Sequence, residues 1–134
     1  MSADVSGLVD YLNIKGAVIM AESKLRDLSK DFAVKSLRLC ENINGHYSLK
    51  NQLERAATSI GANIHEANYA HSRADFIAKL QIALKECYET EYWLELLVDA
   101  EIFDKSSIAD LQTQCGTIRR LLVASINTAK NNQK

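Results

Sequence analysis

Histidine, cysteine and paired glutamate are the side chains in this sequence whose chemistry could serve catalysis or metal binding. His46, His65 and His71 stand at no ligand spacing to one another or to a cysteine, and the Glu-x-x-His repeats of di-iron bundles are missing. Glu89 and Glu91 are two positions apart, so on a helix they point to different sides and cannot act as one carboxylate pair. We therefore expect no catalytic site, no metal site and no bound cofactor.

The cysteines are odd in number and widely separated, at Cys40, Cys87 and Cys115. Each falls on an apolar helical stripe, which predicts small buried side chains rather than disulfide partners or nucleophiles. The sequence also lacks a glycine-rich phosphate loop and the G-x-S-x-G motif of serine hydrolases. We predict that the protein is not an enzyme and takes no small-molecule substrate.

The composition predicts a few long helices in one domain. The 134-residue chain has no proline and five glycines, and 47% of its residues are apolar, enough to build a core. No stretch approaches the roughly 18 apolar residues of a membrane span, and the N-terminus lacks a signal-peptide pattern, so we expect a cytoplasmic protein. The formal net charge of −1 does not by itself demand a nucleic-acid partner.

Apolar residues recur at steps of three and four in four segments, which is the spacing of one helix face. Gly45 should end the first helix, and Ser48, Ser72 and either Asp104 or Ser106 are the expected N-caps of the next three. Short connections favour a single all-α domain, an antiparallel up-down-up-down four-helix bundle. The expected helices span about 14–44, 48–70, 73–102 and 105–130, with residues 1–13 and 131–134 only partly ordered.

An apolar arc on the third helix lies away from its core stripe. Ile82, Trp93 and Leu96 fall within this narrow arc when each residue advances about 100° around the helix. An outward aromatic residue with two aliphatic neighbours is typical of a self-association surface, and these three are the candidate oligomer interface. Alternatively, the third helix is the most buried one and its own chain covers the arc.

A polar seam flanks the apolar stripe of the second helix, at Arg55, Ser59, Asn63 and Glu66, and Glu89 and Glu91 of the third helix complete it. Such a seam can pair with acidic residues of the third helix, within one subunit or across an interface. Glu91 is the expected partner, because its angle falls inside the core-facing arc, where an unpaired carboxylate would be unfavourable. The alternative is an ordinary solvated polar face.

Charge is unevenly distributed along the chain. Residues 86–104 contain acidic residues and no Lys or Arg, whereas residues 119–134 contain basic residues and no acid. The candidate nucleic-acid-binding residues lie on the first and last helices: Lys24, Arg26, Lys30, Lys35, Arg119, Arg120 and Lys130.

The segments 52–67, 72–77 and 83–91 resemble a known family. They are similar to four-helix-bundle proteins encoded in intervening sequences of bacterial 23S rRNA genes, which are related to the accessory variability proteins of diversity-generating retroelements. His65 and Ala67 stand where many members have Ala and Gly. The matching residues are Arg55, Ala56, Ser59, Asn63, Ile64, Glu66, Ser72, Phe76, Glu89 and Glu91.

The resemblance implies a homopentameric ring, a nucleic-acid-binding role for some members and no known catalysis. The leading hypothesis is therefore a non-enzymatic oligomer that binds structured RNA, such as ribosomal RNA, or another nucleic acid. The alternative is a protein–protein adaptor or scaffold that does not bind nucleic acid. Neither hypothesis involves a membrane.

Overall fold

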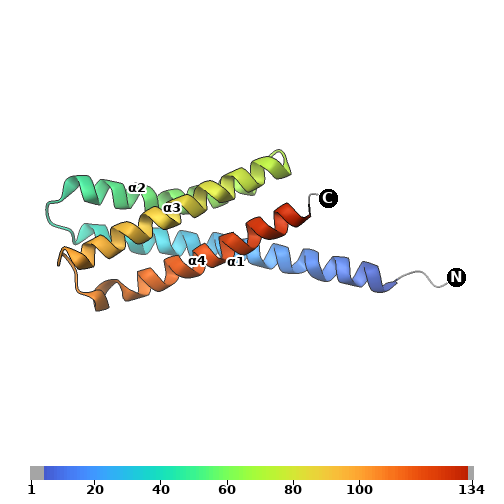
Figure 1. Cartoon of the computed structure of the whole chain (residues 1–134), viewed down its shortest axis with the longest axis horizontal. Coiled ribbons are helices and arrows are strands. Elements are labelled where there is room, and N and C mark those ends of the chain that lie inside the picture. Colours follow the sequence, from blue (N-terminus) through green and yellow to red (C-terminus); the bar gives the residue numbers. More distant parts are fainter. Residues whose placement is uncertain (1–4, 133–134) are drawn as a thin grey trace.

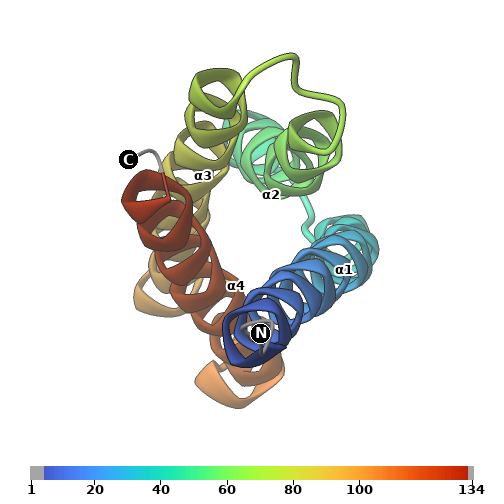
Figure 2. The same ribbon diagram turned by 90° about the vertical axis from the view of Figure 1, so that its right-hand side faces the viewer.

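The computed structural model describes residues 5–132, in which four helices and no strands occur. They are α1 (Val5–Glu41), α2 (Tyr47–Ala67), α3 (Arg73–Asp99) and α4 (Lys105–Asn131). Successive helices run in opposite directions (Figure 1), each packs against its neighbour in sequence, and α1 packs against α4 to close the bundle (Figure 2). The predicted antiparallel four-helix bundle is confirmed.

One apolar stripe from each helix faces the bundle axis and forms the core. Phe32 of α1 and Leu94 of α3 are among the largest side chains with no exposed surface. The helix propensity of these segments is modest, so most of their stability comes from burying this stripe. Other members of the core are Leu25, Cys40, Leu53, Ile60, Cys87, Leu97, Ile108, Cys115, Ile118 and Leu122.

Small residues bring α1 and α2 close together. Ala56 and Ala57 are fully buried, and a Cβ atom added to Gly61 would lie 3.4 Å from the carbonyl oxygen of Ser29. Ser29 and Ser36 continue the core stripe of α1, and both are buried. The Ser29 hydroxyl donates to a backbone carbonyl one turn earlier, whereas the Ser36 hydroxyl has no hydrogen-bond partner.

Helix α1 begins at Val5, well before the predicted start near residue 14. The prediction was wrong because it followed the buried stripe. Every side chain described from Ser6 to Ala17 is exposed, so no burial pattern marks this part of the helix. The other expected partly ordered residues, 1–4 and 133–134, lie outside the described range.

Helices α1, α2 and α3 each end about one turn before the predicted boundary. After α2, the amides of Asn68, Tyr69 and Ala70 donate to carbonyls three residues back, which makes a tighter turn than an α-helix. After α3, the Ile102 amide donates to the Leu97 carbonyl, and Glu101 adopts a left-handed φ of 60°. This is a Schellman ending formed without glycine, which sequence inspection does not detect.

The N-caps agree only in part with the predictions. The Ser72 hydroxyl accepts a hydrogen bond of 3.1 Å from the Asp75 amide, as expected of a helix cap. Asp104 occupies the N-cap position of α4, without a side-chain cap bond. Ser48 is not a cap, because left-handed Gly45 and His46 turn the chain and α2 starts at Tyr47.

Candidate functional site

Arg55 of α2 joins two carboxylates of α3. Its guanidinium lies 3.3 Å from both oxygens of Glu86 and 2.6 Å from Glu89, and the indole nitrogen of Trp93 donates to the same Glu89 oxygen at 3.3 Å. Glu86 is 8% exposed. The hydrogen bond from Arg55 holds the pKa of the Glu89 carboxyl below its usual value. Two helices and the single tryptophan are thus connected by one charged network.

Sequence analysis did not identify Glu86 as a member of this seam. Its position between core residues Ala83 and Cys87 was the available signal, since a carboxylate on a buried stripe needs a partner. Glu91, the partner expected from the sequence, pairs instead with Arg119 of α4 at 2.6 Å. Residues two positions apart on a helix face different neighbours, which explains why Glu89 and Glu91 bind different helices.

The remaining seam residues split between contacts within α2 and contacts with α3. Glu66 pairs with Lys79 of α3 at 3.0 Å. Asn63 donates to the backbone oxygen of Ser59 at 2.8 Å and to its hydroxyl at 3.0 Å, so these two bond within their own helix. The described contacts of the seam therefore stabilise the subunit itself.

The candidate self-association arc on α3 is only partly exposed. Ile82 is 42% exposed, whereas Trp93 and Leu96 are half-buried and Trp93 packs against the core. Tyr88 and Tyr92 are more exposed, and Tyr92 makes an edge contact with Trp93 at a centroid distance of 5.1 Å. These two tyrosines, one turn apart, extend the arc and were missed because the search followed aliphatic residues and tryptophan.

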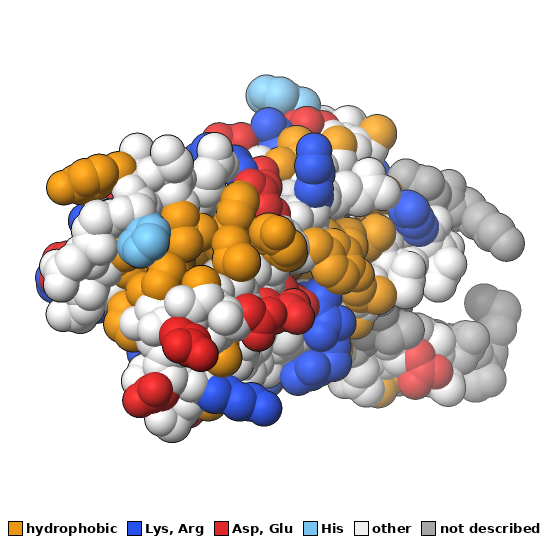
Figure 3. Space-filling model, turned by 60° about the vertical axis from the view of Figure 1, so that its left-hand side comes forward, with side chains coloured by type: hydrophobic (Ala, Val, Ile, Leu, Met, Phe, Trp, Pro, Cys, Tyr) orange, Lys and Arg blue, Asp and Glu red, His pale blue; other side chains and the backbone are white. Residues whose placement is uncertain are grey.

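The candidate nucleic-acid-binding residues differ in whether an acidic partner holds them. Lys35 pairs with Asp31, Arg119 with Glu91, and the exposed Arg26 lies 3.6 Å from Asp27. Arg120 donates to a threonine hydroxyl within α4. Lys24, Lys30 and Lys130 are exposed without an ion pair among residues 5–132. Figure 3 shows basic and acidic side chains interspersed on one face, with apolar side chains between them.

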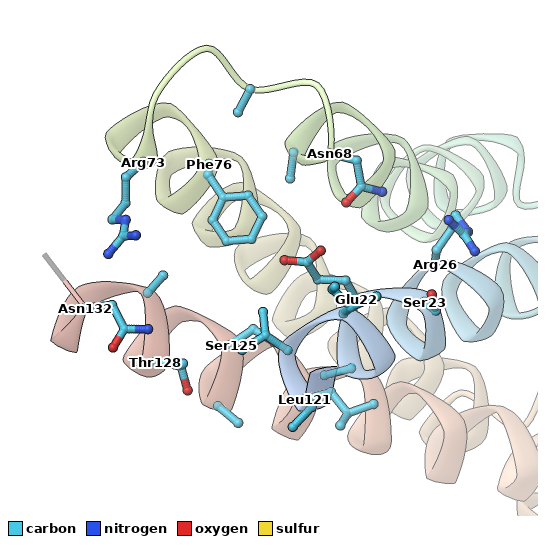
Figure 4. A pocket seen from close by; sticks show the side chains of 18 of the residues that line it. Glu22, Ser23, Arg26, Asn68, Arg73, Phe76, Leu121, Ser125, Thr128 and Asn132 are labelled. Atoms are coloured by element: carbon cyan, nitrogen blue, oxygen red, sulfur yellow. The ribbon is translucent and has the colours of Figure 1, made fainter. Parts of the chain in front are cut away.

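A cleft of about 1070 Å³ opens where the ends of the helices diverge. Figure 4 shows Phe76 of α3 and Glu22 of α1 pointing into it, with Ser125 and Thr128 along the α4 wall. Burial raises the pKa of the Glu22 carboxyl. Sequence analysis did not predict the cleft, because its walls come from all four helices: the interior of α1, the end of α2, the start of α3 and the end of α4.

Cationic and aromatic side chains line the rim of this cleft. Arg26 and Arg73 lie on opposite sides of it (Figure 4), and His65 and Tyr69 line it from the end of α2. The His65 and Tyr69 rings are 5.3 Å apart, and Tyr69 is 73% exposed. The fold therefore brings together basic and aromatic residues that are distant in sequence, of which only Arg26 was predicted as a binding residue.

The thiols are buried in the core. Burial raises the pKa of the Cys40 thiol to about 11, and a hydrogen bond with Cys115 together with burial raises that of Cys87. Within the described residues, no group of three or more His, Cys, Asp or Glu side chains could hold a metal ion. None of the helices in that range has an apolar stretch long enough to cross a bilayer.

The fold and its charged seams define a compact α-helical bundle of the up-down class, with helix pairs joined by ion pairs. Residues 21–124 match the family model of the 23S rRNA-intervening sequence proteins. The chain belongs to this family.

The bundle is similar to a crystal structure of a protein with unknown function from the S23 ribosomal protein family of Bacteroides thetaiotaomicron. The two share 41% sequence identity with a TM-score of 0.75, over 80% of this chain and 98% of that one. Comparison with curated proteins finds no match.

Proposed function

We propose that the protein is a non-catalytic, self-associating bundle that binds single-stranded or looped segments of structured RNA. The observation that carries the proposal is the rim of the cleft, where Arg26, His65, Tyr69 and Arg73 come from three parts of the chain. Exposed aromatic rings that stack on bases, beside arginines that contact phosphates, are the usual means of binding such segments. The description of the family, which refers to 23S rRNA, supports RNA as the nucleic acid.

Self-association would compensate for the small charge of each subunit. Following the family resemblance, we propose a ring of five copies that meet through Ile82, Trp93 and Leu96. Five weak RNA sites in one ring gain avidity without any new contact. The same resemblance extends the proposal to a relation with the accessory variability proteins of diversity-generating retroelements.

RNA binding is tested by filter binding of 23S rRNA fragments at several salt concentrations. Replacing Arg26 and Arg73 with glutamine should reduce the magnitude of the salt slope by about 1.4, the value for two lost single-strand phosphate contacts. Tyr69→Ala should weaken binding without changing the slope. Lys85→Gln is the matched control, since Lys85 is exposed on α3 and distant in sequence from the rim. A wild-type protein that forms no salt-sensitive complex would refute the proposal.

The ring is tested by light scattering. Ile82→Glu is a better probe than a change at Trp93, because Ile82 is exposed and its replacement leaves the core intact. We expect a wild-type assembly of at least five chains that Ile82→Glu reduces. A wild type that never exceeds two chains excludes the ring.

A protein adaptor is the second candidate, and the exposed Tyr88 and Tyr92 on the acidic helix α3 favour it. Tyrosines are enriched at protein interfaces because they combine apolar area with a polar tip. A pull-down that survives nuclease and high salt, and that Tyr88→Ser abolishes, would support the adaptor over the RNA-binding protein.

A further inference from the structure

The first part of α1 projects beyond the bundle. We define the projecting segment as residues 5–16. Every described side chain from Ser6 to Gly16 is exposed, and Figure 1 shows this end of α1 extending past the other helices. The segment is a continuation of the long helix α1, and packing against a partner would stabilise it further.

The projecting segment also lies outside the region that matches the family. The family model covers residues 21–124, so the segment lies outside the matched region. We therefore sought a role for it in its own surface.

An apolar stripe runs along the outer side of this part of α1. We define the outer stripe as Leu8, Leu12, Gly16 and Ile19, which are separated by steps of four, four and three and so share one face. The leucines and the isoleucine are 54–57% exposed. At about 100° per residue, the stripe lies on the opposite side of the helix from the core residues Leu25 and Phe32.

Gly16 has no explanation within its own subunit. An added Cβ atom there would meet nothing within 4 Å, and the residue lies inside a helix, where glycine is less favourable than alanine. A glycine on an apolar stripe lets a second helix approach closely. The absence of a neighbour in the chain points to a neighbour from outside it.

We propose that the outer stripe pairs in antiparallel fashion with the outer stripe of a second copy. In this arrangement Leu8 faces the partner's Ile19, and Leu12 faces the partner's Gly16, so a large side chain occupies the space that the glycine leaves. A parallel pair would place glycine opposite glycine and leave that space empty. Ile19 also lines the cleft, so this end of the outer stripe borders the cleft, while Leu8 and Leu12 lie on the projecting segment beyond it, where the partner's helix can approach.

The apolar area that the outer stripe and its flanking residues expose is sufficient for a specific but weak contact. Leu8, Leu12 and Ile19, with the flanking Val9 and Met20, are 46–74% exposed. Their exposed apolar surface is on the order of 400 Å² per copy, and with the polar flanks two copies bury roughly 1000 Å², the lower limit for specific interfaces. The two-fold symmetry makes the contact close on itself rather than propagate.

The composition of the segment favours a protein partner over a membrane surface. Helices that lie on membranes carry many Lys and Arg residues on the polar side. Residues 5–20 contain one lysine, Lys15, and one acidic residue, Asp10. Electrostatic attraction to anionic lipids would therefore be weak, whereas a nearly neutral stripe can pair with itself without repulsion.

The test is the solution mass of the full chain by sedimentation equilibrium. The two-fold contact joins two copies of a free subunit, or two rings face to face, so Leu12→Glu should halve the mass. Asn13→Glu is the matched control: it adds the same charge at an exposed neighbouring position off the stripe, and it should leave the mass unchanged. Leu12 is 55% exposed and is not part of the core, so the variant should fold as the wild type does.

In a second variant, the helix content of the monomer and the stability of the dimer should change in opposite directions. Gly16→Ala should increase the helical circular dichroism signal of the monomer, because alanine favours the helix, and yet weaken the dimer, because the methyl group collides with the partner's Leu12. An unchanged mass for Leu12→Glu would overturn the pairing. So would binding to phosphatidylcholine vesicles that Leu12→Glu abolishes while the mass stays constant, since the stripe would then belong to a lipid surface.

The test of the pairing by Leu12→Glu does not depend on the proposed ring. If the ring is absent and the pairing is correct, the mass falls from two chains to one in Leu12→Glu. If the ring is present and the pairing is absent, both proteins have the mass of five chains.

Discussion

Replacing Arg55 with alanine should lower the free energy of unfolding by about 2 kcal/mol, an estimate that combines two contacts of different exposure. The contact with Glu89 is partly solvated, because the arginine side chain is 50% exposed and the glutamate side chain 28%. Solvent screening limits it to at most about 1 kcal/mol. The Glu86 side chain is 11% exposed, and loss of Arg55 leaves its carboxylate without a partner, at about 1–2 kcal/mol.

The assay is urea denaturation at pH 7 and fixed protein concentration, followed by circular dichroism and by tryptophan emission. Trp93 is the single tryptophan and donates to Glu89, so its emission should also change in the native state of Arg55→Ala. For a chain of this length, the loss corresponds to a decrease in Tm of about 7 °C. Arg38→Ala is the matched control, because Arg38 pairs with Glu41 entirely at the surface, and should cost less than about 0.5 kcal/mol.

A double-mutant cycle tests whether the buried Glu86 carboxylate causes the larger part of the stability loss in Arg55→Ala. In a Glu86→Leu background no unpaired charge remains, and Arg55→Ala should cost about 1 kcal/mol or less. The reasoning is refuted if Arg55→Ala and Arg38→Ala have the same effect on stability. It is also refuted if the cost of Arg55→Ala is unchanged in the Glu86→Leu background.

Four further experiments test separate features. Ser36→Ala should raise stability by about 1 kcal/mol, because it removes a buried hydroxyl without a partner; lower stability would reveal a hidden hydrogen bond. Glu101→Gly should raise stability by up to about 1 kcal/mol by relieving the left-handed φ of 60°, whereas Glu101→Ala should not. Because the folded pKa of Glu89 is depressed, its stabilisation is present above about pH 4.3 and is lost as the pH falls through the lower folded value. Urea titrations between pH 5 and 3 should therefore show a smaller loss for Arg55→Ala than for the wild type. The Cys40 thiol, with a pKa of about 11, should not react with a thiol reagent at pH 8 until urea unfolds the chain; reaction in the native state would contradict its burial.

The fold was predictable because its signals are local. Apolar residues at steps of three and four follow directly from helix geometry, Ser72 marks a helix start by known backbone chemistry, and left-handed Gly45 lies in the turn between α1 and α2. These signals define four helices and the short connections between them. Short connections then leave antiparallel packing as the simplest arrangement.

The partners of charged residues were not predictable to the same degree. Which helix Glu91 meets depends on the rotation of α3 between its two neighbours, and the sequence pattern does not determine that angle to within one residue. Glu86 was missed because its stripe was treated as apolar. Arg26 from the interior of α1 and Arg73 from the start of α3 line the same cleft, and only the three-dimensional arrangement brings these residues together.

The length of α1 has a consequence for the motions of the chain. Its 37 residues form one continuous helix, of which the part from Leu25 onward is fixed by the core, whereas every side chain described before residue 17 is exposed. Amide hydrogen exchange should therefore become slower along this single helix, from rates near those of a free peptide around Leu8 to rates set by global unfolding around Phe32. The position at which protection begins marks where the bundle starts to hold the helix, and it should move toward the N-terminus when the protein concentration is high enough for two copies to meet.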